Sequence, residues 1–440
     1  MERMESLGKM KITYHNSYQL YKNKTIQYLM TLFSFLIILN HSVYYYMENV
    51  DSIISNAIIV CTLLVFLVTT GAKIKKDCKW PLVLCMGISL LYFAFGDIGG
   101  GVFSYVARYL YFVPLTISIL SALNKYNKFS IFFTLSDIIS TIAIISLFFW
   151  VFTSLFQVLP NMGFIETSWG GISGSGDTKG VINHFFVYFS AQKTYWNMGP
   201  IYRNCGIFCE GPAYAFILAL AIITETFLRD AKNKKRLVIL WITMITTLTT
   251  SAVLYFIFVC AMKWYLSKKA SKSLKNMILP LLLFALFIGI QYMLQFKLNQ
   301  RSVLIRMSAY NNAFTAFVSK PLFGYGYKYD VASNFFTGIT DSFSDALVRG
   351  GICFISIYLI PLVVGTFVLF RKIQKKRAVN GTDFEKQFVI LVFALYSFMT
   401  CTLTYTFIML LFICYGYTII GKEGQNGRYK KNNYNTSEIY

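Results

Sequence analysis

Long apolar stretches, separated by short runs of lysine and arginine, dominate this chain. Only a helix satisfies its own backbone hydrogen bonds in hydrocarbon, so an apolar stretch of about 20 residues predicts a membrane-spanning helix. About twelve such stretches are present. They are 28–47, 52–70, 80–97, 103–123, 130–158, 211–228, 237–250, 251–264, 276–294, 350–370, 387–402 and 404–420. The combined stretches 237–264 and 387–420 are each long for one span and short for two, so each is a candidate pair of short helices. Total span numbers of eleven or ten therefore stay open.

Composition supports a membrane protein, because 56% of the residues are apolar and only 14% are charged, outside the range of soluble proteins. We predict an all-α, polytopic membrane protein with a single transmembrane domain over residues 1–440. Two long outer segments, 159–210 and 295–349, join predicted spans. Long loops in a compact protein are usually functional or disordered, and the composition of these two argues against disorder.

The basic residues lie mostly on one side of the predicted membrane. That side holds 31 of the 41 lysines and arginines and nine of the 19 acidic residues, so it carries the whole net charge of +22. The positive-inside rule assigns this side, with both termini, to the cytoplasm. The excess charge therefore indicates topology, and it does not indicate nucleic-acid binding.

The outer side has ten basic residues, and five of them are arginines. These arginines are Arg108, Arg203, Arg301, Arg306 and Arg349. A guanidinium offers a planar fork of donors that matches phosphate oxygens and stays charged at any relevant pH. A cluster of them beside the bilayer suits a lipid-linked diphosphate. The alternative is that each one reaches lipid headgroups or pairs with a nearby acid.

The first patterned segment opens with Arg203, reaches Glu210 and Pro212, and runs directly into a predicted span. Proline is favoured in the first turn of a helix, and Glu210 would lie at the positive end of that helix. Its carboxylate could accept a proton from an attacking hydroxyl while Arg203 holds an anion. A capping acid and an ion-paired arginine are the alternative interpretation.

The second segment is a predicted amphipathic helix, 303–318, lying in the outer interface. Ser319-Lys320-Pro321 ends it, and Gly324-Tyr325-Gly326 forms a turn. Asp341 and Asp345 precede the next span and are candidates for substrate contact or for helix capping. Inside the predicted spans, Asp137 and the span-edge Arg108 are functional candidates, and pairing between them stays open. The candidate substrate-binding residues are Arg108, Arg301, Lys320, Tyr325, Asp341 and Arg349.

Together these segments resemble the O-antigen polymerase family (Wzy) and, more distantly, the O-antigen ligases. Arg203, Gly206, Phe208, Glu210 and Pro212 look like the polymerases' motif of Arg, Gly and Glu-Pro, with Gly211 intervening here. Arg306, followed by Pro321, Gly324 and Gly326, looks like the second shared motif, and Thr249-Thr250-Ser251 resembles the family's Thr/Ser turn. The resemblance covers most of the chain in topology and makes Arg203, Glu210 and Arg306 the candidate catalytic residues.

The resemblance implies a glycosyltransferase of the bacterial cytoplasmic (inner) membrane. It would join undecaprenyl-diphosphate-linked oligosaccharide repeat units into an O-antigen or capsule, with membrane lipids and a chain-length regulator as further partners and no cofactor or metal. One alternative is an O-antigen ligase, but ligases typically carry a histidine after the Gly-x-Gly turn, and none lies between Gly326 and Gly350. The other is a flippase or transporter, which predicts polar groups lining mid-membrane cavities.

Overall fold

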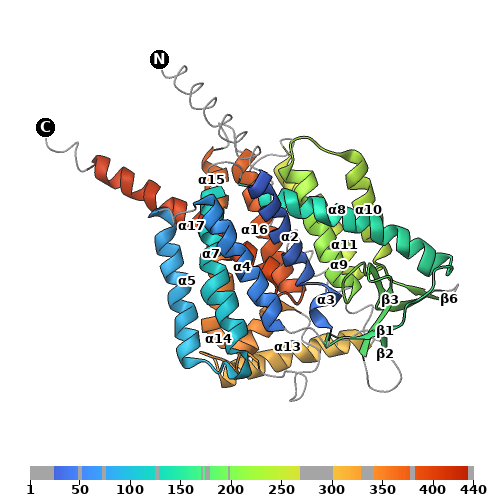
Figure 1. The fold of residues 1–440 in the computed structure, drawn as a ribbon. Coiled ribbons are helices and arrows are strands. Elements are labelled where there is room, and N and C mark those ends of the chain that lie inside the picture. The colour runs from blue at the N-terminus through green and yellow to red at the C-terminus, as the bar shows by residue number, and fades with distance from the viewer. Residues whose placement is uncertain are drawn as a thin grey trace.

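The computed structural model describes residues 24–47, 52–71, 76–123, 128–169, 172–173, 179–196, 199–267, 301–328, 341–376 and 382–434. This part of the chain is predominantly helical (Figure 1). Its α-helices are α2 (Lys24–Leu39), α3 (Val43–Tyr46), α4 (Ser52–Thr70), α5 (Lys76–Phe95), α6 (Val102–Tyr105), α7 (Val113–Leu123), α8 (Ser130–Trp150), α9 (Gly211–Ile223), α10 (Lys234–Thr246), α11 (Thr250–Leu266), α13 (Arg301–Ser319), α14 (Ser342–Leu359), α15 (Gly365–Lys376), α16 (Thr382–Thr400) and α17 (Phe407–Tyr434). Wider π-helical turns extend four of these helices: η2 (Val106–Phe112), η3 (Val151–Leu155), η4 (Thr224–Leu228) and η5 (Ile360–Val364).

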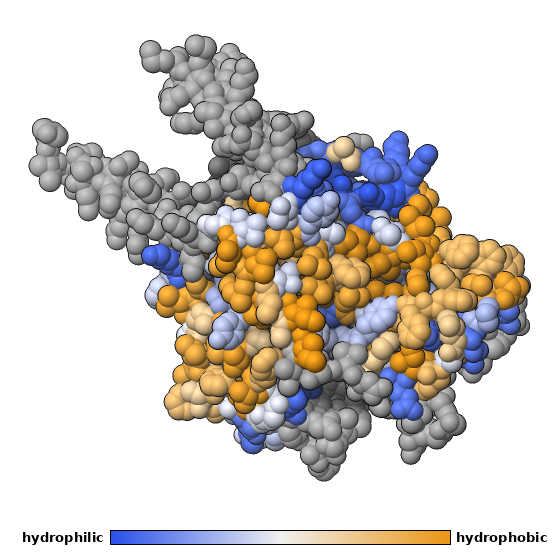
Figure 2. Space-filling model, in the orientation of Figure 1, coloured by the Kyte–Doolittle hydropathy of each residue, from blue (hydrophilic) through white to orange (hydrophobic). Residues whose placement is uncertain are grey.

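Within the described residues, five continuous helical stretches are long and apolar enough to cross a membrane. They are Cys78–Phe95, Gly99–Leu123, Ser130–Leu155, Gly211–Leu228 and Ser342–Gln374. Shorter apolar helices accompany them at Lys24–Leu39, Ile54–Thr70, Thr250–Leu266 and Phe407–Gly421. Figure 2 shows a broad apolar belt with a hydrophilic patch at one edge, over the start of α10. The predicted span 276–294 lies outside the described residues.

Both ambiguous apolar stretches form pairs of helices, which confirms that interpretation of 237–264 and 387–420. The first stretch breaks at Leu248, whose φ is 51°, and the Thr249 hydroxyl then caps α11 by accepting from the amide of Ala252. The second breaks before Thr406, whose hydroxyl accepts from the amide of Met409 at 3.3 Å. Capping hydroxyls satisfy amides that a helix start leaves unbonded, so two short helices replace one long helix.

Helix α9 lies buried inside the helical bundle. Helix α9 is apolar on all sides, and 89% of the Gly211–Leu228 stretch is buried. A helix that is apolar all round belongs inside a bundle. It packs against α8, α10 and α11, and the Phe216 ring stacks on Phe393 of α16 with centroids 5.6 Å apart. The segment that precedes α9, with Arg203 and Glu210, is thereby attached to a helix that is buried on all sides.

The first outer segment contains β-structure that the sequence analysis did not predict. Strands β1 (Phe164–Glu166), β2 (Ile172–Ser173), β3 (Lys179–His184) and β4 (Tyr188–Ser190) form an antiparallel sheet in which β3 pairs with the other three. Strands β5 (Lys193–Trp196) and β6 (Gly199–Tyr202) form a hairpin that ends directly at Arg203. The amide of Phe189 in β4 also bonds to the Gly206 carbonyl at 2.9 Å. The all-α expectation therefore holds for the apolar stretches and is wrong for this segment, whose strands are too short to give a periodic pattern.

The predicted amphipathic helix is present as α13, which runs across the ends of other helices at the base of Figure 1. Ala313 and Ala316 are buried beside Val348 of α14. On its other side Tyr310, Phe314 and Val318 form an exposed apolar stripe at four-residue spacing. One face therefore packs on the protein and another stays apolar and open, as in an interfacial helix.

Candidate functional site

Arg203 lies at the end of the β5–β6 hairpin and contacts Gln192, which precedes β5. Its amide bonds to the Gln192 carbonyl at 2.9 Å, and Nη1 donates to Gln192 Oε1 at 3.5 Å. Its Nε has no hydrogen-bond partner, and no carboxylate of the described residues lies within ion-pair distance. The alternative of an ion-paired arginine is therefore not what the described structure shows. The half-buried guanidinium keeps donors that an anion can use.

Glu210 is the N-cap residue of α9 by backbone geometry, at the positive end of the helix as predicted. Its side chain makes no capping hydrogen bond, so the capping alternative does not hold. Burial raises the pKa of the neighbouring Cys209 thiol, and the Glu210 carboxylate raises it further. The Glu210 side chain is therefore half-buried at the start of α9.

Gly211, the residue that separates Glu210 from Pro212, lets the α10–α11 turn approach the site. A Cβ atom there would lie 2.7 Å from Thr249 Cγ2 and 3.1 Å from the Thr247 carbonyl oxygen. Its amide donates to Gln192 Oε1 at 3.3 Å, the same oxygen that Arg203 contacts. A glycine between Glu210 and Pro212 therefore has a steric reason, because it lets the turn before α11 approach Arg203 and Glu210.

That turn carries a chain of hydroxyl groups beside the site. Thr247 and Thr249 are joined through their hydroxyls at 3.1 Å, and Ser251 donates to Thr249 at 3.1 Å. Asn204, next to Arg203, bonds to the Thr246 carbonyl at 3.0 Å and to its hydroxyl at 2.9 Å. These bonds hold the Arg203 segment against the end of α10.

Replacing Gly211 by alanine tests this close contact. We expect Gly211→Ala to lower the free energy of unfolding by about 1–3 kcal/mol, because the new methyl group overpacks against Thr249. Thr249→Ser removes the opposing Cγ2 and keeps the hydroxyl that caps α11. Thermal unfolding in detergent should show the double variant recovering part of the loss. A double variant no more stable than Gly211→Ala would mean that the contact with Thr249 is not the cause.

Arg108 lies in η2, 5% exposed, among aromatic side chains. Its Nη1 donates to the Tyr327 hydroxyl at 2.9 Å and its Nη2 to the Tyr45 hydroxyl at 2.7 Å. The guanidinium carbon lies 5.7 Å from the ring centroids of both Tyr405 and Phe407. Nε has no partner, and no described carboxylate pairs with this buried charge. An unpaired buried cation is costly, which marks the position as a candidate anion site.

Arg349 shares two of these aromatic residues with Arg108. Its Nη1 donates to the Tyr327 carbonyl at 3.1 Å, and its guanidinium lies 5.2 Å from the Tyr405 ring centroid. Unlike Arg108, it is ion-paired, with 2.6 Å between Nε and Asp345 Oδ1. The structure therefore brings Arg108 and Arg349 together around Tyr327 and Tyr405, and we call these four residues the arginine–tyrosine cluster.

The Gly324-Tyr325-Gly326 turn builds this cluster. Gly324 and Gly326 have φ of 63° and 122°, and a Cβ at Gly324 would lie 2.5 Å from the Arg349 carbonyl carbon. The amides of Tyr325 and Gly326 bond to the carbonyls of Val348 and Arg349 at 2.9 and 2.8 Å. Glycine permits both the left-handed backbone and the close approach. The turn thereby delivers the next residue, Tyr327, to the guanidinium of Arg108.

The remaining candidates of the second segment lie apart from this cluster or outside the described side chains. Asp341 caps α14, its Oδ1 accepting from the Ser344 amide at 2.8 Å, and burial raises the pKa of its carboxyl. The capping alternative is therefore correct for Asp341. Lys320 is exposed, with its Nζ 4.6 Å from the ring centroid of Tyr325. The backbones of Arg301 and Arg306 lie in α13, and their side chains lie outside the described residues.

Helix α3 connects the Arg203 segment with the arginine–tyrosine cluster. The sequence analysis placed its residues inside the span 28–47. The amide of Val43 bonds to the Ile207 carbonyl at 2.9 Å, in the Arg203 segment. Two residues on, Tyr45 holds Arg108, and Tyr46 lies within electrostatic reach of both Arg108 and Glu210. The run Tyr44-Tyr45-Tyr46 was the available sequence signal. Tyrosines carry a polar tip on an apolar body, as a site at a membrane boundary requires.

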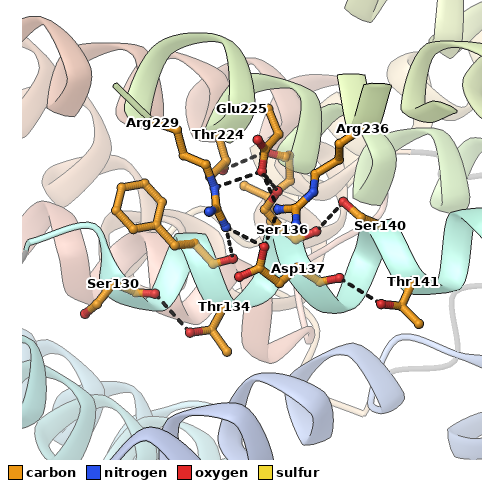
Figure 3. A network of polar contacts seen from close by, with 12 residues as sticks. Ser130, Thr134, Ser136, Asp137, Ser140, Thr141, Thr224, Glu225, Arg229 and Arg236 are labelled. Atoms are coloured by element: carbon orange, nitrogen blue, oxygen red, sulfur yellow. Dashed lines mark hydrogen bonds and ion pairs between the residues drawn. The ribbon is translucent and has the colours of Figure 1, made fainter. Parts of the chain in front are cut away.

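Asp137 does not pair with Arg108, so the pairing that the sequence analysis left open between these two residues is wrong. Its Oδ1 lies 2.5 Å from Arg229 Nη2 and also contacts Arg236 Nη1 (Figure 3). Both arginines contact Glu225 Oε1 as well, at 2.9 and 3.1 Å. Asp137 faces the basic cluster that begins α10, because the path of α8 brings it to α9 and α10 there. The group belongs to the basic side of the fold, away from the arginine–tyrosine cluster.

The two acids of this group should differ in their effect on stability. Glu225 is 1% exposed and also accepts from Ser136 at 2.8 Å, so Glu225→Gln should destabilise by about 1–3 kcal/mol. Asp137 has a half-exposed side chain, and Asp137→Asn should cost at most about 1 kcal/mol. Thermal unfolding of both variants in the same detergent measures the difference. Equal losses would contradict the assignment of Glu225 as the central acceptor.

Within the described residues, no group of three or more histidine, cysteine, aspartate or glutamate side chains is placed to hold a metal ion. No protein-family model and no curated protein matches this chain. Functional assignment therefore depends on the geometry of these residues.

Proposed function

We propose that this protein is a polymerase of the bacterial cytoplasmic membrane, joining undecaprenyl-diphosphate-linked oligosaccharide repeat units into a surface polysaccharide, either an O-antigen or a capsule. The proposal includes about twelve membrane spans, two long outer segments and cytoplasmic termini. Helix α2 begins and α17 ends at the same end of the molecule in Figure 1, which supports that orientation. The O-antigen resemblance supports the reaction class.

The observation that carries the proposal is the buried guanidinium of Arg108. It keeps an unpartnered Nε and has no carboxylate partner among the described residues. Arg349 also lies beside the Tyr405 ring, but its charge is balanced by Asp345, so Arg108 is the unbalanced cation of the cluster. A diphosphate supplies the missing negative charge and accepts charge-assisted hydrogen bonds, which offsets the cost of burying the cation. Sugar-bearing lipid diphosphates combine such a headgroup with a membrane anchor.

The reaction is a displacement at the anomeric carbon of the growing chain. A hydroxyl oxygen of the acceptor repeat unit bonds to that carbon, and the bond from the carbon to the diphosphate oxygen breaks. The hydroxyl proton passes to the Glu210 carboxylate. The lipid diphosphate leaves with the electron pair, and Arg203, Arg306 and Arg108 stabilise its developing charge. Lipid-linked sugars serve as both donor and acceptor, so the proposal includes no further cofactor.

Purified protein in detergent micelles tests this proposal directly. Incubated with undecaprenyl-diphosphate-linked repeat units alone, it should yield a ladder of longer chains by mass spectrometry. A flippase moves its substrate without joining repeat units, so it would leave the chain length unchanged. A ligase needs an added acceptor lipid of another kind before any product forms. Absence of the ladder with correctly folded protein would overturn the polymerase assignment.

A further inference from the structure

An apolar groove runs between α2 and α4 on the surface of the fold. It consists of two adjoining hollows, of about 460 and 340 Å³, which share the side chains of Ile54 and Ile58. The first extends to Leu29 of α2, and the second extends to Leu39. Because ten helical residues separate those leucines, the groove follows α2 for about 15 Å.

The groove offers very few polar groups to an occupant. Apart from Cys61, Thr62, Ser55 and two tyrosines, aliphatic side chains line it. The Thr62 hydroxyl is already bonded to the Ile58 carbonyl of its own helix at 2.8 Å. Ile54 and Ile58 are 60% and 48% exposed, so the described residues leave about half of each one open to an occupant. Hydrocarbon is the ligand class that such a surface favours.

One end of the groove reaches the buried charge of the proposed site. Tyr44 and Tyr45 line the second hollow, and the Tyr45 hydroxyl is the one that Arg108 contacts at 2.7 Å. Arg108 is 5% exposed, has no carboxylate partner among the described residues and keeps a free Nε. The groove ends at a tyrosine whose hydroxyl is bonded to a guanidinium without a described carboxylate partner, and such a surface complements an amphiphile with an apolar chain and an anionic head.

We infer that the α2–α4 groove binds the first isoprene units of a polyprenyl diphosphate, with the diphosphate at Arg108 and Tyr45. The choice of a prenyl chain over a bilayer phospholipid rests on the proposed function, in which the donor is lipid-linked. In the part of the chain that the structure describes, the groove lies between two helices and leads to one cation, Arg108, so it suits one chain and one headgroup. Tyr45 then acts as the boundary between the chain and the charged site.

Ile58→Trp tests the inference, because Ile58 lines both hollows and a larger ring there fills the groove without entering the core. Val68→Trp is the matched control, since Val68 lies on the same helix, is 80% exposed and lines neither hollow. Binding of undecaprenyl diphosphate, followed by native mass spectrometry, should weaken at least about 10-fold in Ile58→Trp, the effect of losing roughly two buried methylene contacts. Val68→Trp should bind as the wild type does, and inorganic diphosphate should bind all three proteins alike.

Two outcomes would overturn the inference. One is unchanged affinity of Ile58→Trp for undecaprenyl diphosphate, and the other is equally strong competition by phosphatidylglycerol, which would make the groove a bilayer-lipid site. The result is separable from the proposed function. If Ile58→Trp weakened binding but the wild-type protein lengthened no chains, the groove assignment would hold and the polymerase proposal would fail. If the wild-type protein lengthened chains but Ile58→Trp bound undecaprenyl diphosphate normally, the polymerase proposal would hold and the groove assignment would fail.

Discussion

Glu210→Gln is expected to lower the rate of chain lengthening at least about 100-fold, because an amide cannot accept the proton of the attacking hydroxyl. Glutamine keeps the size and shape of glutamate. Glu210 makes no capping hydrogen bond to α9, so loss of a helix cap does not enter the result. The measurement is the initial rate of ladder formation in micelles with a defined lipid-linked repeat unit.

The matched control for this prediction is Glu166→Gln. Glu166 is exposed and lies in β1 of the same outer segment. Glu166→Gln therefore makes the same substitution at a position away from α9. It should polymerise at the wild-type rate. If Glu210→Gln retained wild-type activity, Glu210 would lose its role as the base, whereas the anion site at Arg108 would be unaffected.

Arg108→Met is expected to abolish chain lengthening to a similar degree, about 100-fold or more, while leaving the fold intact. Methionine matches the apolar surroundings of Tyr405 and Phe407 and removes an unpaired buried charge, which is usually neutral or stabilising. Two hydrogen bonds, to Tyr45 and Tyr327, are lost at about 1 kcal/mol each and offset that gain. We therefore expect a small change in the unfolding midpoint together with a large loss of activity.

Arg349→Met provides the contrast, because Arg349 is paired with Asp345. Its removal leaves a buried carboxylate without that partner and should lower the free energy of unfolding by about 3 kcal/mol. Stability and activity then fall together in Arg349→Met and separate in Arg108→Met. Wild-type chain lengthening by Arg108→Met would remove the observation on which the proposed function depends.

The local features of the fold were accessible from sequence. The apolar stretches predicted helices because hydropathy is a property of consecutive residues, and the breaks at Leu248 and Thr406 follow from unusual stretch lengths and capping hydroxyls. Pro212 marked the start of α9 and placed Glu210 at its positive end. The strands of the first outer segment escaped prediction, because each spans two to six residues and their pairing partners lie across loops.

The sequence was a poorer guide to which residues come together in the candidate site. Sequence analysis grouped the arginines by the predicted side of the membrane, and it could not say which of them would lie beside acids. The structure brings two of that group, Arg108 and Arg349, to the same tyrosines. Asp345 lies one helical turn from Arg349, so that pair is local. Tyr327 and Arg108 are 219 residues apart, and only the Gly-x-Gly turn folded onto α14 brings them together.

The order of apolar and basic residues determined, without any structure, that this chain forms apolar helices suited to a membrane, with its basic residues in short runs between them. Tertiary structure decided which charges remain unpaired: Asp137 faces Arg229 and Arg236, and Arg108 faces tyrosines. The physical reason is the separation along the chain over which each effect acts. Hydropathy and capping act between neighbours in the chain, whereas the cost of burying a guanidinium depends on side chains that distant helices bring to it.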